Sequence, residues 1–201
     1  DLLDAEGVDA VGVRVTPDRN TGVGLIIKDV AGSNIIVVDM GANELFGTAD
    51  VDASVGAVTV ADTVLAQLEI PLETVLHGLR IAHEAGVRTV LNPAPAVDLT
   101  QTDLSAVDIL TPNETEARVV LGLDPEHPMP NEEIAARLLA LGCRCVVMTL
   151  GEQGAAVYEK TEGGISEHLI QPWRVDVVDT NGAGDSFNAA LSVALGEGAG
   201  V

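Results

Sequence analysis

Aromatic side chains are almost absent from this chain of 201 residues, which holds one Trp, one Tyr and two Phe. Because hydrophobic residues still make up 47% of it, disorder is excluded, and the core must consist of Val, Leu, Ile and Ala. Such a core is typical of a buried parallel sheet covered by helices. The sequence also lacks a signal peptide, a lipidation motif and any apolar run of about 18 residues, so we expect a cytoplasmic protein.

Basic residues are scarce as well. Lys and Arg number 10 against 31 acidic residues, which gives a net charge of −21, and the only lysines are Lys28 and Lys160. This charge excludes nucleic acid as a partner, because a phosphate backbone is bound by clustered Lys and Arg, and it disfavours an anionic membrane surface. A nucleotide would have to be attracted by local groups instead of the bulk charge.

Cysteine is limited to Cys143 and Cys145, in the run GCRCVVMTL. This run predicts a strand, in which residues two apart point to the same face. We interpret the pair as small buried strand residues, with neither a disulfide nor a metal site, because no further Cys or His cluster accompanies them.

The hydrophobic pattern predicts a β-hairpin over 21–39, with a turn at 31–34, followed by alternating strands and helices. We expect strands at 63–69, 87–95, 107–113 and 144–151, helices at 71–86, 113–122 and 131–141, short β runs at 155–159, 167–172 and 174–178, and a final helix from the GAGD turn. Repeated β-α-β units imply an α/β fold with a parallel sheet between two helical layers, and the hairpin forms a small β appendage or lid. Polar residues at the carboxyl ends of the strands should converge on one edge, namely Glu69, Asn92, Asn113, Thr149 and Asp179.

The run DTNGAGDSF at 179–187 contains a glycine-rich turn that could take part in catalysis. Gly182, Ala183 and Gly184 let backbone N–H groups approach a ligand, and the helix that follows adds a positive dipole end, so a phosphoryl group could be stabilised without a lysine. Asp185 lies beside these amides and could accept a proton from a hydroxyl group. Alternatively, Asp185 only complements the dipole and the glycines only form a turn; the motif by itself leaves both interpretations open.

Asn113 and Glu116, in TPNETEA, have the spacing of a capping box at a helix start. From the residues alone, a structural cap is the favoured interpretation. Glu69, by the same standard, is a solvated strand end.

DTNGAGDSF resembles the D-T-x-G-A-G-D motif of the ribokinase-like (PfkB) carbohydrate kinases. TGVGLII, GAN at 41–43, AQLEIPLE, LNPAPA, DILTPNETEA and TLGEQG are similar to segments of that family, in the same order and at similar spacing. The resemblance implies a ribokinase-like three-layer sandwich with a mostly parallel sheet and a small β lid. It also implies a kinase that transfers phosphate from ATP to the primary hydroxyl of a pentose, of which D-ribose fits best.

The resemblance assigns roles to the residues of the turn. Asp185 would be the catalytic base and would contact the sugar, and Gly182, Ala183 and Gly184 would form the anion hole. Asp179 and the carbonyl of Asn181 would bind K⁺, with Asn181 replacing the more usual Thr, Ile or Val.

The remaining roles that the resemblance implies concern the nucleotide and the sugar. Asn113, Thr149, Gly151, Gly154 and Gly184 would bind the nucleotide. Glu116 would hold Mg²⁺ through water, so that the structural cap and this role can coexist. Glu69, Gly24 and Ile36 would contact the sugar, the last two from the lid.

The resemblance further implies that residues 1–48 comprise part of the α/β domain with the lid, that 49–201 form an incomplete nucleotide- and sugar-binding domain, and that the lid mediates a homodimer. The family's N-terminal G-G-x-G-x-N segment and its C-terminal adenine pocket have no counterpart here, so we expect a fragment that binds sugar and nucleotide poorly. Fructokinase, deoxyribose kinase and nucleoside kinase remain alternatives, as does a non-catalytic sugar- or nucleotide-binding regulator. A dinucleotide-dependent dehydrogenase is excluded by the lack of G-x-G-x-x-G.

Overall fold

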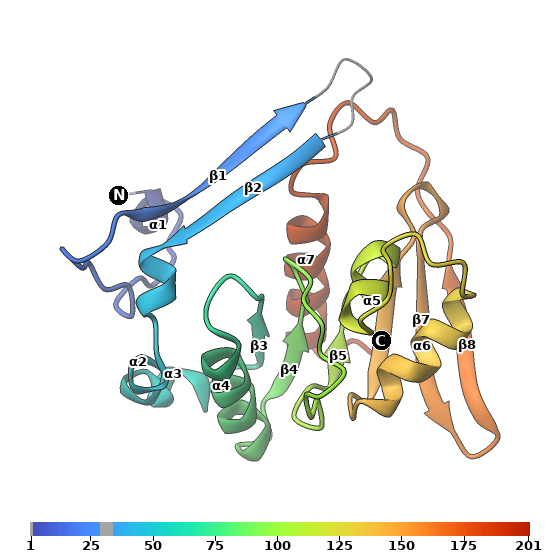
Figure 1. Cartoon of the computed structure of the whole chain (residues 1–201). Helices are drawn as coiled ribbons and strands as arrows, with labels where there is room; N and C mark the ends of the chain where they lie inside the picture. Colours follow the sequence, from blue (N-terminus) through green and yellow to red (C-terminus); the bar gives the residue numbers. More distant parts are fainter. Residues whose placement is uncertain (1, 29–33) are drawn as a thin grey trace.

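The computed structural model describes residues 2–28 and 34–201, with the side chains of 26–28 and 34–36 left out. It contains two sheets (Figure 1). The smaller one is the predicted hairpin, an antiparallel ribbon of β1 (Thr21–Lys28) and β2 (Asn34–Gly41). Most of its predicted turn lies outside the described residues.

The larger sheet has six strands in sequential order: β3 (Thr63–Ala66), β4 (Arg88–Leu91), β5 (Ile109–Leu110), β6 (Cys145–Thr149), β7 (Ala155–Thr161) and β8 (Gly164–Ile170). The first four pair in parallel, whereas β7 and β8 add to the edge in antiparallel fashion. The prediction of a mostly parallel α/β sheet is thereby confirmed.

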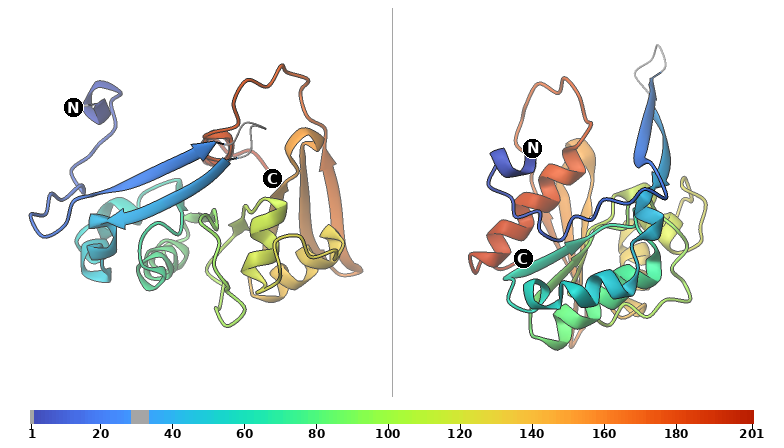
Figure 2. Two further views of the ribbon diagram at one scale, coloured as in Figure 1. Left: turned by 45° about the horizontal axis from the view of Figure 1, so that its top comes forward. Right: turned by 90° about the vertical axis from the view of Figure 1, so that its left-hand side faces the viewer.

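Helices cover both faces of this sheet, as predicted (Figures 1 and 2). On one face lie α4 (Leu72–Glu84), α5 (Glu114–Val120) and α6 (Asn131–Ala140), and on the other α7 (Ala183–Gly196). Adjacent strand residues alternate between the two cores: Leu91 and Leu110 pack with the first helices, while Val90 and Ile109 pack on the side of α7. Short helical segments complete the chain: α1 (Leu2–Ala5), η1 (Ala42–Leu45), α2 (Thr48–Ala53), α3 (Val55–Val58) and η2 (Gly151–Gln153).

The two cysteines are buried, but the prediction that they share one face is wrong. Because β6 begins only at Cys145, Cys143 lies in the preceding turn and packs in the core with α6, whereas Cys145 faces the side of α7. Burial raises the pKa of both thiols to about 12, so both are inert structural residues.

Several predicted strands are longer than the observed ones, and one is absent. β5 is shorter than expected because, at its start, side chains take the place of backbone hydrogen bonds to β4. Asp108 accepts from the N–H of Thr89 at 3.0 Å, and Thr89 Oγ1 accepts from the N–H of Asp108 at 2.8 Å. The β run expected at 174–178 is not a strand. Pro172 follows β8 and lacks the N–H that a ladder requires, and the side chains after it are exposed.

The β1–β2 ribbon rises above the carboxyl ends of the parallel strands, where the lid was expected (Figures 1 and 2). Across the described part of the chain, no helix combines the length and apolar character that a bilayer crossing requires.

Candidate active site

The carboxyl edge of the parallel sheet collects polar residues from three neighbouring strands. Gln67 follows β3, Asn92 follows β4, and Thr111 follows β5. Asn92 and Thr111 are buried, at 6% and 2% exposure. Each makes side-chain hydrogen bonds, so the cost of burying these polar groups is offset.

The glycine turn leads directly into α7 at the same edge. Gly182 occupies the left-handed region with φ 73°, which favours glycine, and it is the N-cap of the helix. The N–H of Ala183 donates to the carbonyl of Thr180 at 3.1 Å, so this amide is already engaged. The N–H groups of Gly184 and Asp185 have no hydrogen-bond partner among the described residues, so both amides remain available to an anionic ligand.

Asp185 is exposed in the first turn of α7, where the helix dipole favours a negative charge. Its Oδ1 accepts a hydrogen bond from Nε2 of Gln67 at 3.2 Å. The structure describes no hydrogen-bond partner for Oδ2. One carboxylate oxygen is therefore held by the protein, and the other can accept a proton.

Asp179 and Asn181 lie together at the start of the turn. Oδ1 of Asp179 accepts from the N–H of Asn181 at 3.0 Å, and Oδ2 accepts from Nδ2 of Asn181 at 3.3 Å. The Asn side chain, unlike the Thr, Ile or Val usual there, thus bonds to the carboxylate. A monovalent cation would compete with these bonds for Asp179, while the carbonyl of Asn181 is the type of ligand that it prefers.

Glu69 and Gly24 line one hollow of about 270 Å³ between the ribbon and the end of β3. Asn43, from η1, lines it as well. Ile36 lies on β2 opposite Ile26, and its side chain belongs to the part that the structure leaves undescribed. The residues predicted to contact the sugar from the lid and from the sheet therefore meet at Gly24 and Glu69.

Asn113 and Glu116 form the capping box that their spacing predicts. The N–H of Asn113 donates to Glu116 Oε2, and the N–H of Glu116 donates to Asn113 Oδ1, both at 2.8 Å. Burial raises the pKa of Glu116, while the bond from Asn113 opposes the shift. Asn113 also forms a parallel bridge to Thr149, so these two predicted nucleotide ligands lie side by side.

Gly151 begins the short turn η2 after β6, and Gly154 follows that turn. Gly154 has φ 92°, and a Cβ added there would overlap the carbonyl oxygen of Ile170. Position 154 therefore requires glycine, because the end of β8 passes close to it. Gly151 has φ 56° with no atom near its missing Cβ, so space remains there for a ligand.

Among the residues that the structure describes, no group of three or more His, Cys, Asp or Glu could hold a metal ion. The assignment of Glu116 to Mg²⁺ stays a prediction. An ion held there would take its other ligands from water and from phosphate oxygens, which Mg²⁺ accepts readily.

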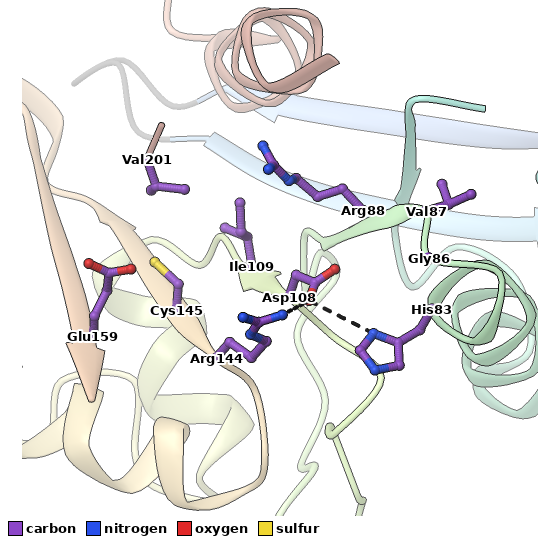
Figure 3. A pocket seen from close by; sticks show the side chains of 10 residues that line it. All are labelled: His83, Gly86, Val87, Arg88, Asp108, Ile109, Arg144, Cys145, Glu159 and Val201. Carbon is purple, nitrogen blue, oxygen red and sulfur yellow. Dashed lines mark hydrogen bonds and ion pairs between the residues drawn. The ribbon is translucent and has the colours of Figure 1, made fainter. Parts of the chain in front are cut away.

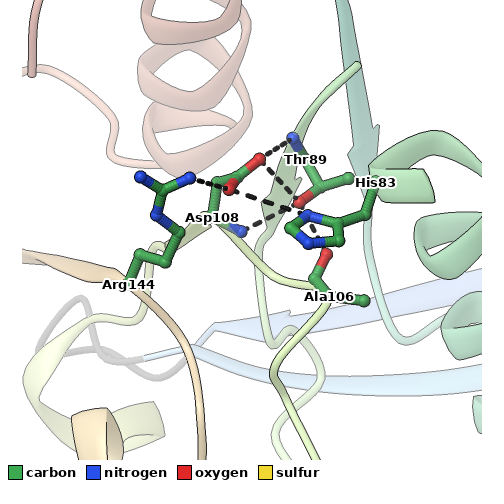
Figure 4. A network of polar contacts seen from close by, with 5 residues as sticks. All are labelled: His83, Thr89, Ala106, Asp108 and Arg144. Carbon is green, nitrogen blue, oxygen red and sulfur yellow. Dashed lines mark hydrogen bonds and ion pairs between the residues drawn. The ribbon is translucent and has the colours of Figure 1, made fainter. Parts of the chain in front are cut away.

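A larger hollow, of about 470 Å³, lies at the opposite, amino edge of the sheet (Figure 3). In this hollow, Asp108 binds Arg144 Nη1 at 3.3 Å and approaches His83 Nδ1 at 3.8 Å (Figure 4). Arg88 Nη1 donates to the carbonyls of Leu195 and Ala199 at the end of α7, at 3.4 and 3.5 Å. The Arg88 contacts join the end of α7 to the sheet, at the opposite edge from the glycine turn.

The sequence predicted Asn92 at this edge but not Gln67 or Thr111, nor Asn188 of α7, whose Oδ1 accepts from Thr111 Oγ1. None of the three has an assigned role in the motifs that carry the family resemblance. The position of Gln67 and Thr111 just after predicted strands was the available signal. Asn188 carried none, since a polar residue inside an apolar helix becomes informative only when its partner is known.

Comparison with known proteins agrees with this geometry. The family model described as pfkB family carbohydrate kinase matches residues 1–201. The chain is 38% identical to the ribokinase of Schizosaccharomyces pombe over 98% of its own length and 62% of the relative. It is 32% identical to a deoxyribokinase of Salmonella typhi over 92% of its length and 60% of the relative.

The solved structure of Arabidopsis thaliana ribokinase complexed with ribose and ATP superimposes with a TM-score of 0.80 at 30% identity, covering 96% of this chain and 62% of that one. The chain belongs to the pfkB family of carbohydrate kinases, and its fold is ribokinase-like. It spans about three fifths of the length of these relatives.

Proposed function

We propose that the protein transfers the γ-phosphoryl group of ATP to the primary hydroxyl of D-ribose, giving D-ribose 5-phosphate and ADP. The observation that carries this proposal is the arrangement at the start of α7. The free Oδ2 of Asp185 lies in the same turn as the open N–H groups of Gly184 and Asp185. The names of the relatives, several of which are ribokinases, support the choice of sugar.

The reaction follows from these groups. The sugar hydroxyl donates its proton to Asp185 Oδ2 while its oxygen forms a bond to the γ-phosphorus. The bond from phosphorus to the β–γ bridging oxygen breaks, and its electron pair leaves with ADP. The two N–H groups and the helix dipole stabilise the charge that develops on the phosphoryl oxygens.

The other predicted residues complete the site. The sugar would lie in the hollow between the ribbon and Glu69, whose carboxylate can accept from two hydroxyls. The nucleotide would lie along Asn113, Thr149 and Gly151. Mg²⁺, near Glu116, would neutralise phosphate charge, and K⁺, near Asp179 and Asn181, would raise the positive potential of the anion hole.

The organisation around the site is part of the same proposal. Residues 1–48 would supply part of the α/β domain and the lid, and 49–201 the incomplete nucleotide- and sugar-binding domain, in a cytoplasmic protein. The ribbon exposes Val23, Leu25 and Val37 on one face, an apolar surface that suits a homodimer through the lid.

A sugar panel tests the proposal. The protein, expressed over the full length that its gene encodes, is assayed for ADP release with ATP and Mg²⁺ in K⁺, using ribose, 2-deoxyribose, fructose and a nucleoside. We expect ribose to give the highest kcat/KM, and tetramethylammonium in place of K⁺ to lower the rate. A higher kcat/KM for 2-deoxyribose would make that sugar the assigned substrate, in line with the deoxyribokinase relative. Tight sugar binding without turnover would indicate a regulator.

A further inference from the structure

The hydrogen bonds around Asp185 form a closed ring that passes through three strand ends and returns to α7. Gln67 Nε2 donates both to Asp185 Oδ1, at 3.2 Å, and to Asn92 Oδ1, at 3.1 Å. Asn92 Nδ2 donates to the carbonyl of Thr111 at 2.9 Å. The ring thus begins at the side chain that we assign as the base and leads into the sheet.

The second half of the ring returns from the sheet to the helix. Thr111 Oγ1 donates to Asn188 Oδ1 at 2.5 Å, and Asn188 Nδ2 donates to the carbonyl of Gly184 at 2.9 Å. Gly184 immediately precedes Asp185. The network therefore holds the carboxylate from one side and its backbone from the other.

The direction of these bonds follows from chemistry. A carboxylate only accepts, so Gln67 must present its NH₂ group to Asp185, and its second N–H is then left for Asn92. Asn92 must in turn use its oxygen toward Gln67 and its NH₂ toward Thr111. Each amide in the ring has one orientation that satisfies every partner.

Burial makes the ring rigid. Asn92, Thr111 and Asn188 are 6%, 2% and 3% exposed, and a buried polar group that loses its partner is costly. Gln67 is half-buried and is the member that reaches the exposed carboxylate. The position of Asp185 is thereby tied to the ends of β3, β4 and β5.

We propose that Gln67 is a positioning residue that, through this ring, fixes the Asp185 carboxylate so that Oδ2 faces the acceptor hydroxyl. This inference rests on the proposed kinase function. Gln67 holds Oδ1 and prevents the carboxylate from rotating, while Thr111 and Asn188 hold the first turn of α7. The ring thus sets the geometry of proton transfer without contacting the phosphate.

Gln67→Met tests the proposal, because Met has nearly the same length but no donor. In the full-length protein we expect kcat with ribose to fall about 10- to 100-fold, as small misplacements of reacting groups do. KM for ATP and for ribose should stay within about twofold of the wild type, since binding groups are untouched. Gln101→Met makes the same change at an exposed loop position and should alter neither parameter.

Two further variants keep the test decisive. Gln67→Asn retains the amide but is one methylene shorter, so it should show the same loss of kcat if Gln67→Met does not fold. Thr111→Val removes the hydroxyl that donates to Asn188, at a site without contact to Asp185, and should also lower kcat. A raised KM for ribose with unchanged kcat in the Gln67 variants would make Gln67 a sugar contact and overturn the proposal.

Hydrogen exchange of the peptide covering 182–190 separates this inference from the proposed function. We expect faster exchange in Gln67→Met and Thr111→Val than in the wild type and in Gln101→Met. Inactivity of the wild type toward every sugar would refute the kinase assignment, while the exchange result would still decide whether the ring holds the turn. Unchanged exchange in both ring variants would refute the ring.

Discussion

Asp185 has two properties that bear on its role at the start of α7. The dipole of α7 stabilises its charge, and its free Oδ2 lies beside amides that can bind an anion. A residue that only complemented the dipole would not require a hydrogen bond from a strand end. In the proposed function, the contact with Gln67 restrains this carboxylate, and mutation distinguishes the two interpretations that the motif left open.

Asp185→Asn should lower kcat about 10²- to 10⁴-fold, because an amide cannot take the proton of the sugar hydroxyl. The melting temperature should stay close to that of the wild type, since the residue is exposed. Steady-state ADP release and thermal unfolding measure the two effects. Asp176→Asn, at an exposed position outside the turn, is the matched control; retention of full turnover by Asp185→Asn would reject the base assignment.

Glu116 has a structural role that is visible and a metal role that is proposed, and Glu116→Gln distinguishes them. Gln preserves the capping box and removes a carboxylate whose burial is unfavourable, so stability should be unchanged or slightly higher. If Glu116 also orients the water around Mg²⁺, half-maximal activity should require about 10-fold more Mg²⁺.

A Mg²⁺ titration of activity, together with thermal unfolding, gives both readouts for the Glu116 variant. Glu114→Gln changes the same charge on the same helix, at a side chain that accepts from Asn131. Its Mg²⁺ dependence should match the wild type. If Glu116→Gln has the same Mg²⁺ dependence as the wild type, the metal role of Glu116 is rejected and only its role in the capping box remains.

At the scale of elements, the turn η2 and the end of β8 depend on each other. Gly154 is the residue that lets the chain after Ile170 pass close to the backbone of the turn. The sequence interpretation assigned this glycine to nucleotide binding, and its conformation is explained by packing between two segments. Gly151, with open space around it, is the better candidate for ligand approach.

Gly154→Ala should destabilise the protein by about 1–3 kcal/mol or more, because φ 92° is strained for Ala and its Cβ would overlap Ile170. The melting temperature should fall by about 5 °C or more in differential scanning calorimetry. Gly163→Ala, in the exposed β7–β8 turn with no atom within 4 Å of the added Cβ, should have little effect. Equal melting temperatures for the two variants would contradict the packing argument.

At the scale of the whole molecule, the charge of −21 is a source of self-repulsion. Salt bridges such as Arg19 with Glu44 and Arg137 with Glu133 are exposed and contribute little to stability. The folded chain therefore keeps most of its acidic excess uncompensated.

Raising chloride salt from about 0.01 M to about 0.15 M shortens the Debye length from about 30 Å to about 8 Å and should stabilise the fold. We expect a gain of about 1 kcal/mol, or about 2–4 °C in melting temperature. KCl, NaCl and tetramethylammonium chloride should act alike if screening is the cause. A rise confined to KCl would instead indicate specific cation binding, and no rise at all would contradict the repulsion argument.

The sequence by itself determined the features that depend on neighbouring residues. The hydrophobic pattern predicted a helix at 71–86, which the structure has as α4 (Leu72–Glu84). The Asn113–Glu116 spacing predicted the capping box, and GAGD predicted a glycine turn before α7. Each of these is encoded within a few residues, so the local pattern is sufficient.

Only the tertiary structure decided which distant groups meet. Gln67 and Asp185 are 118 residues apart, and their bond depends on the order and register of the strands. The opposite faces of the two cysteines likewise follow from where β6 begins and which helices pack on each side of it. Such outcomes are set by packing between segments, because no local pattern carries the position of a remote partner.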